Sequence, residues 1–325
     1  KAEQLIFTKN TTEALNLGIK GLLRSGDHVI TTSMEHNSVL RPLKSLEKFG
    51  ITHSVLRADR DGLLTAADIE KTIRPNTKLI IVTAASNVTG GKMPIAEIGE
   101  LAKRKGIFFM VDGAQGAGCM PLDVAHMHID LLAFPGHKGL LGPQGSGGLY
   151  ASPRTALRPM LEGGTGTESK SREQPREFPE GFEAGTINAP AIIGLGRGTE
   201  FVAKIGVDVI ARYEEELISY LDACLDEMPG VLRYGPPAGK KTGITLFNIE
   251  GLPAEEVTAT LNNQYGIAVR GGYHCAGLAH KSIGTWEQGG VRVSVGPFNT
   301  KAQMQKLTDA VWQISSRQTR QNRLL

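Results

Sequence analysis

Short apolar, β-rich runs alternate with helical patterns along the first half of the chain, and this alternation constrains the fold most strongly. Several runs are apolar without interruption, which is typical of strands buried on both faces of a sheet. Strands that alternate with helices usually form a parallel sheet covered by helices. The predicted strands are residues 5–8, 28–32, 53–56, 78–83 and 107–111, and the predicted helices are 12–23, 38–49, 66–73 and 95–105. The sequence therefore predicts an α/β fold with a mostly parallel sheet.

The second half of the chain has a different pattern. Residues 163–186 are rich in Gly, Glu, Ser, Thr and Pro, which predicts a long surface or interface loop. Two helices are predicted within 189–228, broken near Gly206. Further strands are predicted at 246–249, 267–270 and 291–295, with helices near 254–264 and from an Asn299–Thr300 cap to about 315. We expect a large domain, 1–205, followed by a linking helix and a smaller α+β domain, 206–325.

The charge and composition of the chain argue against several classes of function. The net charge is only +3 and no long basic run occurs, so nothing favours a nucleic-acid partner. Three cysteines without a CxxC pair predict a reducing cytoplasmic location. No signal peptide is visible, and no apolar run reaches the roughly 20 residues that a spanning helix needs. We expect no membrane association, no metal site, and a chain that lacks some upstream residues, because it opens at Lys1 almost directly on a strand.

Lys138 lies on a glycine-rich turn after an apolar run, and a lysine in such a turn can form a Schiff base with an aldehyde. A solvated turn residue is the alternative. Asp112 ends an apolar strand, where open α/β sheets place ligand groups. A carboxylate there could keep a pyridinium nitrogen protonated, as pyridoxal phosphate (PLP) requires. Lys138 follows 26 residues later, after another strand. This spacing favours a PLP site over two unrelated surface residues.

The segment 7–16 places a hydroxyl-rich turn between a strand and a helix. Backbone N–H groups at the helix start, with the Thr11 and Thr12 hydroxyls, suit a phosphate group. The alternative is an ordinary helix cap with Glu13 in the first turn.

Eight segments occur in the order and spacing of class V (fold type I) PLP-dependent enzymes: FTKNTTEALN, MEHNSVLRP, SNVTGGKMP, VDGAQ, GHKGLLGPQG, EAGTINAP, VRGGYHCAGLAHK and VRVSVGPFNT. The chain resembles the cysteine desulfurase / selenocysteine lyase family, in its branch with a short cysteine loop. The resemblance implies a fold type I transferase with a seven-stranded, mostly parallel sheet and a smaller C-terminal domain. It also implies that the family's N-terminal segment is missing from this chain.

The resemblance implies roles around the cofactor ring. Lys138 would be the Schiff-base lysine and the base that moves the substrate Cα proton. Asp112 would pair with the pyridine nitrogen, and Gln115 with the ring hydroxyl. His36 would stack on the ring face, although a lone histidine is more often structural. Asn87 would lie near the ring hydroxyl and the substrate.

Other matching positions would bind the cofactor phosphate. Thr12 and His137 would hold it, beside Thr11. Thr186 would reach the phosphate of a partner subunit, which implies a homodimer with shared sites. Pro135 departs from the family, because relatives often carry a phosphate-binding Ser or Thr there and proline has neither hydroxyl nor N–H. Asn10 replaces the usual glycine of the turn, and we expect it to tolerate a left-handed conformation.

The resemblance also implies a substrate site. Arg292 would clamp the substrate carboxylate, a task that suits the guanidinium fork. Arg270 would lie beside the substrate. Cys275 would attack the substrate sulfur, since its loop also carries His274 and Arg270. The alternatives are ordinary exposed arginines and a small buried cysteine.

The predicted function is therefore a PLP-dependent cysteine desulfurase that converts L-cysteine to L-alanine and leaves a persulfide on Cys275. L-Selenocysteine is an alternative substrate, and a sulfur-acceptor protein is a possible partner. A class V aminotransferase, an epimerase and a selenocysteine lyase are alternative activities. A non-catalytic PLP-binding scaffold for sulfur assembly is an alternative of another class, suggested by Pro135 and the missing upstream segment. Cys119 and Cys224 are predicted to be structural.

Overall fold

The computed structural model describes residues 1–322, and residues 323–325 lie outside the described part. The chain forms two compact units. The first comprises Lys1–Leu56, Leu64–Ala84 and Met93–Val207. The second comprises Arg57–Leu63, Ala85–Lys92 and the described residues from Asp208 onward. Two short segments of the N-terminal half thus belong to the second unit. The sequence analysis placed one domain boundary, between residues 205 and 206, and that boundary stays a prediction.

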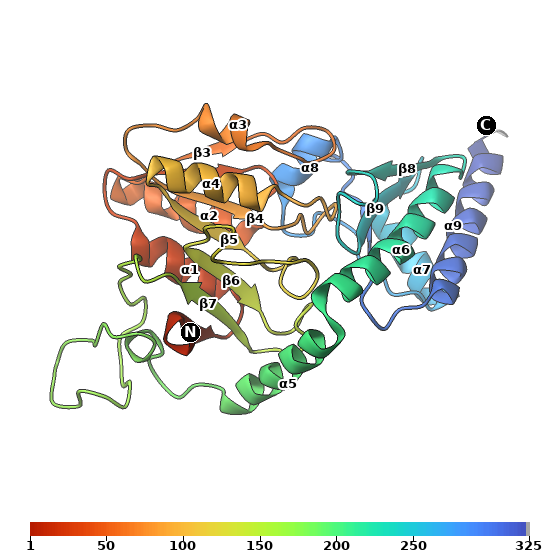
Figure 1. Ribbon diagram of the computed structural model, residues 1–325. Coiled ribbons are helices and arrows are strands. Elements are labelled where there is room, and N and C mark those ends of the chain that lie inside the picture. The colour runs from red at the N-terminus through yellow and green to blue at the C-terminus, as the bar shows by residue number, and fades with distance from the viewer. Residues whose placement is uncertain (323–325) are drawn as a thin grey trace. The chain divides into compact units, whose positions relative to one another are not determined.

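A seven-stranded sheet forms the centre of the first unit (Figure 1). Its spatial order is β1-β7-β6-β5-β4-β2-β3. The pairs β3–β2, β2–β4, β4–β5 and β5–β6 are parallel, while β7 is antiparallel to both β6 and β1. The strands are β1 (Leu5–Thr8), β2 (His28–Thr32), β3 (Thr52–Leu56), β4 (Thr77–Thr83), β5 (Phe108–Asp112), β6 (Leu131–Pro135) and β7 (Gly147–Ala151). The predicted mostly parallel sheet is confirmed.

Helices cover both faces of this sheet. Gly18 of α1 packs against the Met110 side chain, whereas Gly99 of α4 lies against Phe109. Because neighbouring residues of a strand point to opposite faces, α1 and α4 lie on opposite sides of β5. The helices of this unit are α1 (Thr11–Leu22), α2 (Asn37–Leu46), α3 (Ala66–Glu70), α4 (Ile95–Lys105) and α5 (Ala189–Ile205), with short 3₁₀ turns at Ala2–Gln4, Glu47–Phe49 and Glu180–Phe182.

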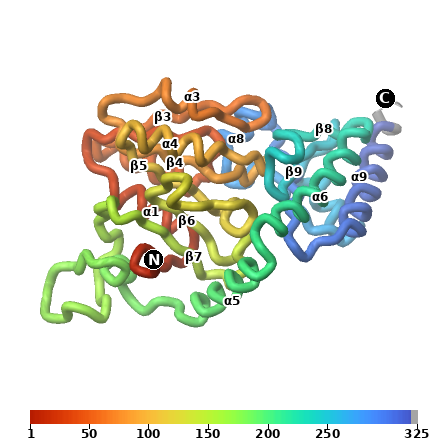
Figure 2. Tube along the Cα trace, in the orientation of Figure 1, coloured from red at the N-terminus to blue at the C-terminus, as the bar shows by residue number. Residues whose placement is uncertain are grey.

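Strand β7 was not predicted, because its sequence begins with glycines that read as a loop. The glycines are required by packing. A Cβ atom at Gly148 would lie 2.6 Å from the Phe134 ring. The long segment between β7 and α5 was correctly predicted as a loop and carries one 3₁₀ turn (Figure 2). The break between α5 and α6 (Val207–Asp226) at Gly206 is also confirmed, and Gly206 has a φ of 93°.

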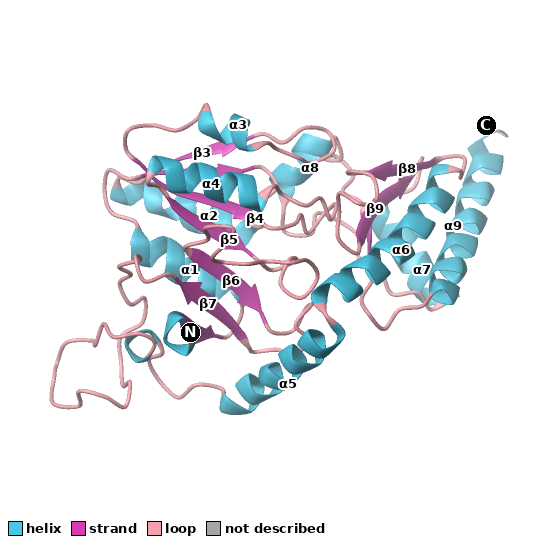
Figure 3. Ribbon diagram, viewed as in Figure 1, coloured by secondary structure: helices cyan, strands magenta, loops and turns pink. Residues whose placement is uncertain are grey.

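The second unit contains an antiparallel sheet in the order β10-β9-β8. Strands β8 and β9 of this sheet are labelled in Figure 3. Its strands are β8 (Val231–Tyr234), β9 (Ile244–Ile249) and β10 (Val291–Ser294), and its helices besides α6 are α7 (Ala254–Tyr265), α8 (Gly277–Ile283) and α9 (Lys301–Asn322). Helices α6, α7 and α9 bury their apolar sides against the sheet residues Phe247 and Val291.

Three sequence predictions for this unit were wrong or incomplete. Residues 267–270 form no strand, and only Arg270 makes a bridge, to Arg292. Strand β8 and helix α8 were missed. The last helix runs to Asn322 rather than 315. Within residues 1–322, no helix combines the length and apolar character needed to cross a membrane.

Candidate active site

Asp112 and Lys138 follow the carboxyl ends of neighbouring parallel strands. Asp112 is the last residue of β5 and is 2 % exposed, and its Oδ1 accepts a hydrogen bond from Ala114 N–H at 2.9 Å. Lys138 is exposed and lies three residues beyond β6. Burial raises the pKa of Asp112, and the nearby Lys138 cation partly opposes that rise. The first unit therefore brings the predicted acid and lysine within electrostatic reach.

A close backbone contact fixes the turn that carries Lys138. A Cβ at Gly139 would lie 2.5 Å from the carbonyl oxygen of Ala117 and 2.5 Å from the Cys119 sulfur. Only glycine allows the two segments to approach this closely. The segment that follows Asp112, which includes half-buried Gln115, is thereby held against the Lys138 turn.

His36 and Thr12 are joined through a residue that the sequence analysis missed. His36 caps α2, and its Nδ1 accepts the N–H of Ser38 at 3.0 Å. The Ser38 hydroxyl lies 2.8 Å from His36 Nδ1 and 2.8 Å from the Thr12 hydroxyl. Ser38 thus links the N-termini of α1 and α2. A serine two residues after a histidine at a helix start was the available signal.

The N-terminus of α1 is capped by Asn10. Its Oδ1 accepts the N–H of Glu13 at 3.0 Å, and its backbone is extended, with a φ of −175°. Asn10 therefore caps the helix in an extended conformation and does not adopt the left-handed conformation that asparagine tolerates. Thr11 is buried in the first turn of this helix, while Thr12 is exposed.

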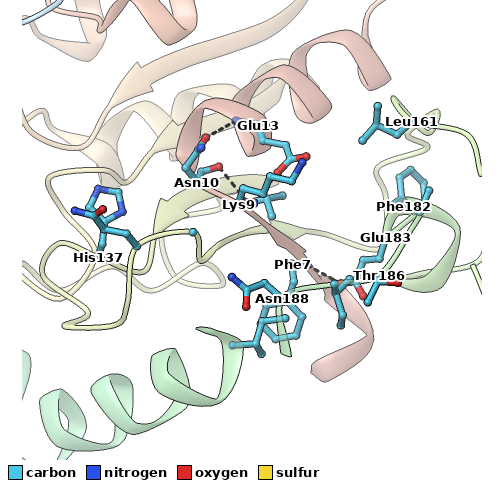
Figure 4. Close-up of a pocket in the computed structure, with 16 residues that line it drawn as sticks. Phe7, Lys9, Asn10, Glu13, His137, Leu161, Phe182, Glu183, Thr186 and Asn188 are labelled. Atoms are coloured by element: carbon cyan, nitrogen blue, oxygen red, sulfur yellow. Dashed lines mark hydrogen bonds between the residues drawn. The ribbon is translucent and has the colours of Figure 1, made fainter. Parts of the chain in front are cut away.

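A cavity of about 580 Å³ lies beside this helix start. The predicted phosphate residues His137 and Thr186 both line it, together with Asn10, Lys9 and Asn188. In the close-up, Asn10 and Lys9 lie across the cavity from Asn188 and Thr186, with His137 to one side (Figure 4). Lys138 and Asp112 are not among its lining residues. Burial, followed by the neighbouring Lys138 cation, lowers the pKa of His137, so its imidazole is neutral near pH 7.

The predicted substrate residues gather in the second unit. Arg292 lies on β10 and donates from Nη1 to the carbonyl oxygen of Asn87 at 2.8 Å. Its Nε is buried and finds no hydrogen-bond partner in the described structure. Asn87 in turn donates from Nδ2 to the carbonyl oxygen of His274 at 2.7 Å. Burial, and then the Arg270 cation, lower the pKa of Arg292, while Cys275 opposes them. Asn87, Arg270, Arg292 and Cys275 thus form one cluster.

Cys275 lies at an unusual turn. His274 and Cys275 have φ angles of 52° and 59°, although neither is glycine. Such left-handed residues are costly and persist where the surrounding structure holds them, often at functional sites. Cys275 is exposed, whereas Cys119 and Cys224 are only partly so. Arg270 Nη2 lies 3.8 Å from the Cys275 sulfur. The turn therefore presents a thiol to solvent beside a cation.

His274 stabilises this turn through a hydrogen bond and adds no positive charge to it. The imidazole is 2 % exposed, and its Nε2 lies 3.1 Å from the carbonyl oxygen of Gly290, to which it donates. Burial, and then the Arg292 cation, lower the pKa of His274 to about 3. The ring is neutral at physiological pH, so Arg270 supplies the positive charge beside Cys275. Among residues 1–322, no group of His, Cys, Asp and Glu side chains is arranged to hold a metal ion.

Comparison with known proteins identifies the family of this chain. Residues 1–307 match the family described as aminotransferase class-V. A probable cysteine desulfurase of Methanothermobacter thermautotrophicus is 37 % identical over 97 % of this chain and 80 % of its own length. The apo structure of a cysteine desulfurase from Thermococcus onnurineus NA1 superposes with a TM-score of 0.92 at 37 % identity, over 97 % of this chain and 80 % of that one.

A cysteine desulfurase from Escherichia coli, CsdA, superposes with a TM-score of 0.88 at 30 % identity, over 95 % of this chain and 78 % of that one. The expected fold type I architecture is therefore confirmed. From its matched family, its relatives and its fold, the chain belongs to the class V aminotransferases, a family of PLP enzymes, and is an enzyme of the cysteine desulfurase type.

Proposed function

We propose that this cysteine desulfurase binds PLP at Lys138 and Asp112, acts on L-cysteine, and receives the sulfur as a persulfide on Cys275. The observation that carries the proposal is the exposed thiol of Cys275 in a left-handed turn, 3.8 Å from the Arg270 guanidinium. Exposure and an adjacent cation are the features of reactive cysteines.

The residues of the first unit fit the cofactor. A buried carboxyl with one oxygen already occupied by Ala114 N–H suits a partner that carries a proton, such as the pyridine nitrogen of PLP. Lys138 would hold the cofactor and then move the Cα proton of the substrate. Gln115 would bind the ring hydroxyl and His36 would cover the ring face. When bound, PLP supplies an electron sink for charge that develops at the substrate Cα.

The phosphate would lie at the start of α1, where Thr11, Thr12 and His137 are available. Thr186 lines the same cavity as His137, and we propose that it serves the phosphate of a partner subunit in a homodimer. Pro135 is the last residue of β6 and offers neither hydroxyl nor N–H, so the phosphate would depend on these other groups.

The second unit fits an amino-acid substrate. The buried Nε of Arg292, which has no hydrogen-bond partner among the described residues, is a donor suited to a carboxylate, while Nη1 is kept in place by the carbonyl group of Asn87. Arg270 would lie beside the substrate. The thiolate of Cys275 would attack the substrate sulfur, so that an S–S bond forms while the C–S bond breaks. The electron pair of the C–S bond stays with carbon, which takes up a proton, and the product leaves as L-alanine.

The test is the Cys275→Ala variant of the PLP-loaded enzyme, assayed for alanine formed from L-cysteine. We expect at least a hundredfold loss of alanine formation, because no thiolate accepts the sulfur, while the visible absorbance of bound PLP is retained. Cys119→Ser and Cys224→Ser serve as controls and should keep their activity. Full activity in Cys275→Ala would refute the role of this thiol.

The same assay separates the alternatives. An aminotransferase would need an oxo-acid acceptor and would not depend on Cys275. A selenocysteine lyase would turn over selenocysteine but little cysteine. A scaffold would show no cofactor absorbance after PLP is added. An acceptor protein for the persulfide and a cytoplasmic location, which rests on the three free cysteines, remain predictions.

A further inference from the structure

Glu35 is a fully buried carboxyl between strand β2 and the proposed ring-stacking residue His36. It is 0 % exposed. Its Oε1 accepts the Thr32 hydroxyl at 2.6 Å and the backbone N–H of Thr83 at 3.1 Å. Thr83 is the last residue of β4 and pairs directly with Asp112 on β5. Glu35 therefore ties the loop that carries His36 to the strand beside Asp112.

Both hydrogen bonds of Glu35 fall on one oxygen. Oε2 is buried and accepts or donates no hydrogen bond within the described residues. An ionised carboxylate spreads its charge over two oxygens, and burying one without a donor is costly. A neutral acid places its carbonyl oxygen at Oε1, where two donors meet it. It leaves an uncharged hydroxyl at Oε2, which costs less to bury without a partner than a share of negative charge. The bonding pattern therefore favours the neutral form.

The electrostatics agree with the bonding. Burial, together with the negative charge of Asp112 and against the hydrogen bonds from Thr32 and Thr83, raises the pKa of Glu35 to about 8. Asp112 on β5 is the charged group that acts on Glu35, and Lys138, beyond β6, acts on Asp112 in turn. His36, the next residue, has its Nδ1 occupied by Ser38.

We propose that Glu35 is a positioning residue that remains protonated at neutral pH and fixes His36 beside the strand of Asp112 without adding a second negative charge there. The inference rests on the proposed function in assigning His36 and Asp112 to the cofactor site. A second buried anion would raise the pKa of Asp112 further. A protonated Asp112 could no longer keep the pyridine nitrogen of bound PLP charged.

The first experiment is thermal unfolding of the cofactor-free protein from pH 5 to pH 9, comparing wild type with Glu35→Gln. The amide keeps an acceptor at Oε1 but does not titrate. A carboxyl with a raised pKa in the folded state loses stability as pH rises from about 4.5 to about 8. We expect the Tm of Glu35→Gln to gain roughly 5 °C on wild type over this range. The exposed control Glu97→Gln should follow wild type, and a Glu35→Gln curve parallel to wild type would overturn the proposal.

A second measurement does not depend on how well the variant folds. Infrared spectra of the Glu214→Gln protein, which keeps Glu35, with ¹³C-labelled glutamate carboxyls should show a protonated carboxyl band at pH 6.5 that disappears by pH 9.5. The background is Glu214→Gln, because burial raises the pKa of Glu214 to about 7 and would give a similar band. Absence of the band at pH 6.5 would show that Glu35 is ionised and would overturn the proposal.

The third readout tests positioning. In the PLP-loaded protein, ionisation of Glu35 near pH 8 should change the visible absorbance of the cofactor through Asp112, and Glu35→Gln should lack this transition. The same transition in both proteins would refute the coupling. The first two measurements use neither cofactor nor turnover, so they stand or fall independently of whether Cys275 accepts sulfur.

Discussion

Arg292 is half-buried on β10 with its guanidinium only partly engaged. The Asn87 carbonyl group fixes Nη1, and Nε points into protein without a partner in the described part of the chain. A buried donor without an acceptor is costly, so such a group calls for a partner, which water or a ligand can supply. At the residue scale, this supports the proposal that Arg292 binds the substrate carboxylate.

We therefore predict that Arg292→Gln raises the KM for L-cysteine about a hundredfold, since a desolvated charge pair is worth roughly 2–5 kcal/mol. Arg292→Lys should recover little, because an ammonium lacks the planar fork. Arg212→Gln, an exposed change on α6, is the matched control. Steady-state kinetics of alanine formation make the measurement, and a KM that stays at the wild-type value in Arg292→Gln would contradict the assignment.

Candidate site residues could be named from the sequence where their chemistry is visible in a short motif. Lys138 among glycines and Asp112 at a strand end were named before the fold was known. Ser38 and Glu35 were not, because their partners come from distant segments, Thr12 and Thr83. His274 was identified only as a neighbour of Cys275. Its burial, which makes it a neutral anchor of the turn, follows from tertiary packing.

At the scale of elements, glycine explains both a missed strand and a close helix contact. Gly148 concealed β7 because the sequence gives no β-branched signal there. Gly99 lies within α4, where glycine is normally unfavourable relative to alanine by about 1 kcal/mol. A Cβ at Gly99 would lie 1.9 Å from the Met127 carbonyl oxygen, so glycine is required by contact. Among the described residues, no heavy atom outside the surrounding helix backbone lies within 4 Å of a Cβ placed at Gly196 of α5.

Replacing these two helix glycines with alanine should change the free energy of unfolding in opposite directions. Gly99→Ala should destabilise the protein by about 2 kcal/mol or more, because the overlap is with backbone and cannot be relieved by a side-chain rotation. Gly196→Ala should stabilise it by roughly 0.5–1 kcal/mol through helix propensity alone. Urea unfolding monitored by circular dichroism measures both. Stabilisation by Gly99→Ala would show that α4 does not pack against Met127 as described.

The predicted strand at 267–270 failed for a related reason. Its apolar and β-branched residues satisfy the strand pattern. Within 267–270, however, only Arg270 pairs with a strand, through two backbone hydrogen bonds with Arg292. A strand needs a neighbour along its length, which a local pattern does not reveal. The long, periodic helices α4 and α7 were predicted closely because their signal is local.

For the whole molecule, buried histidines set the response to acid. Burial is the main cause that lowers the pKa of His28 to about 4, His274 to about 3 and His280 to about 4. Each imidazole is neutral in the folded protein and titrates near 6.5 when unfolded. The unfolded chain therefore binds more protons below pH 6.5, so stability falls as pH drops from 6.5 towards 4.

Buried carboxyl groups limit the stability of the folded protein at alkaline pH. Burial raises the pKa of Glu35 to about 8 and of Glu214 to about 7. Between about pH 4.5 and these values, the folded protein holds protons that the unfolded chain has released, so both groups lose stability as pH rises. Up to pH 6.5 the three histidines outweigh the two carboxyls. Above pH 6.5 the histidine contribution fades and the carboxyl loss continues.

We predict that the cofactor-free protein is most stable near pH 6.5 and loses stability up to about pH 8, as Glu214 and then Glu35 ionise in the folded state. The double variant Glu35→Gln/Glu214→Gln should keep the acid limb, because the histidines are unchanged, but should show no decline between pH 6.5 and pH 8. Calorimetric Tm values from pH 4 to pH 9 test this. A wild-type Tm that rises steadily from pH 6.5 to pH 8 would mean that these carboxyls are ionised, and that the alkaline limit of the molecule has another origin.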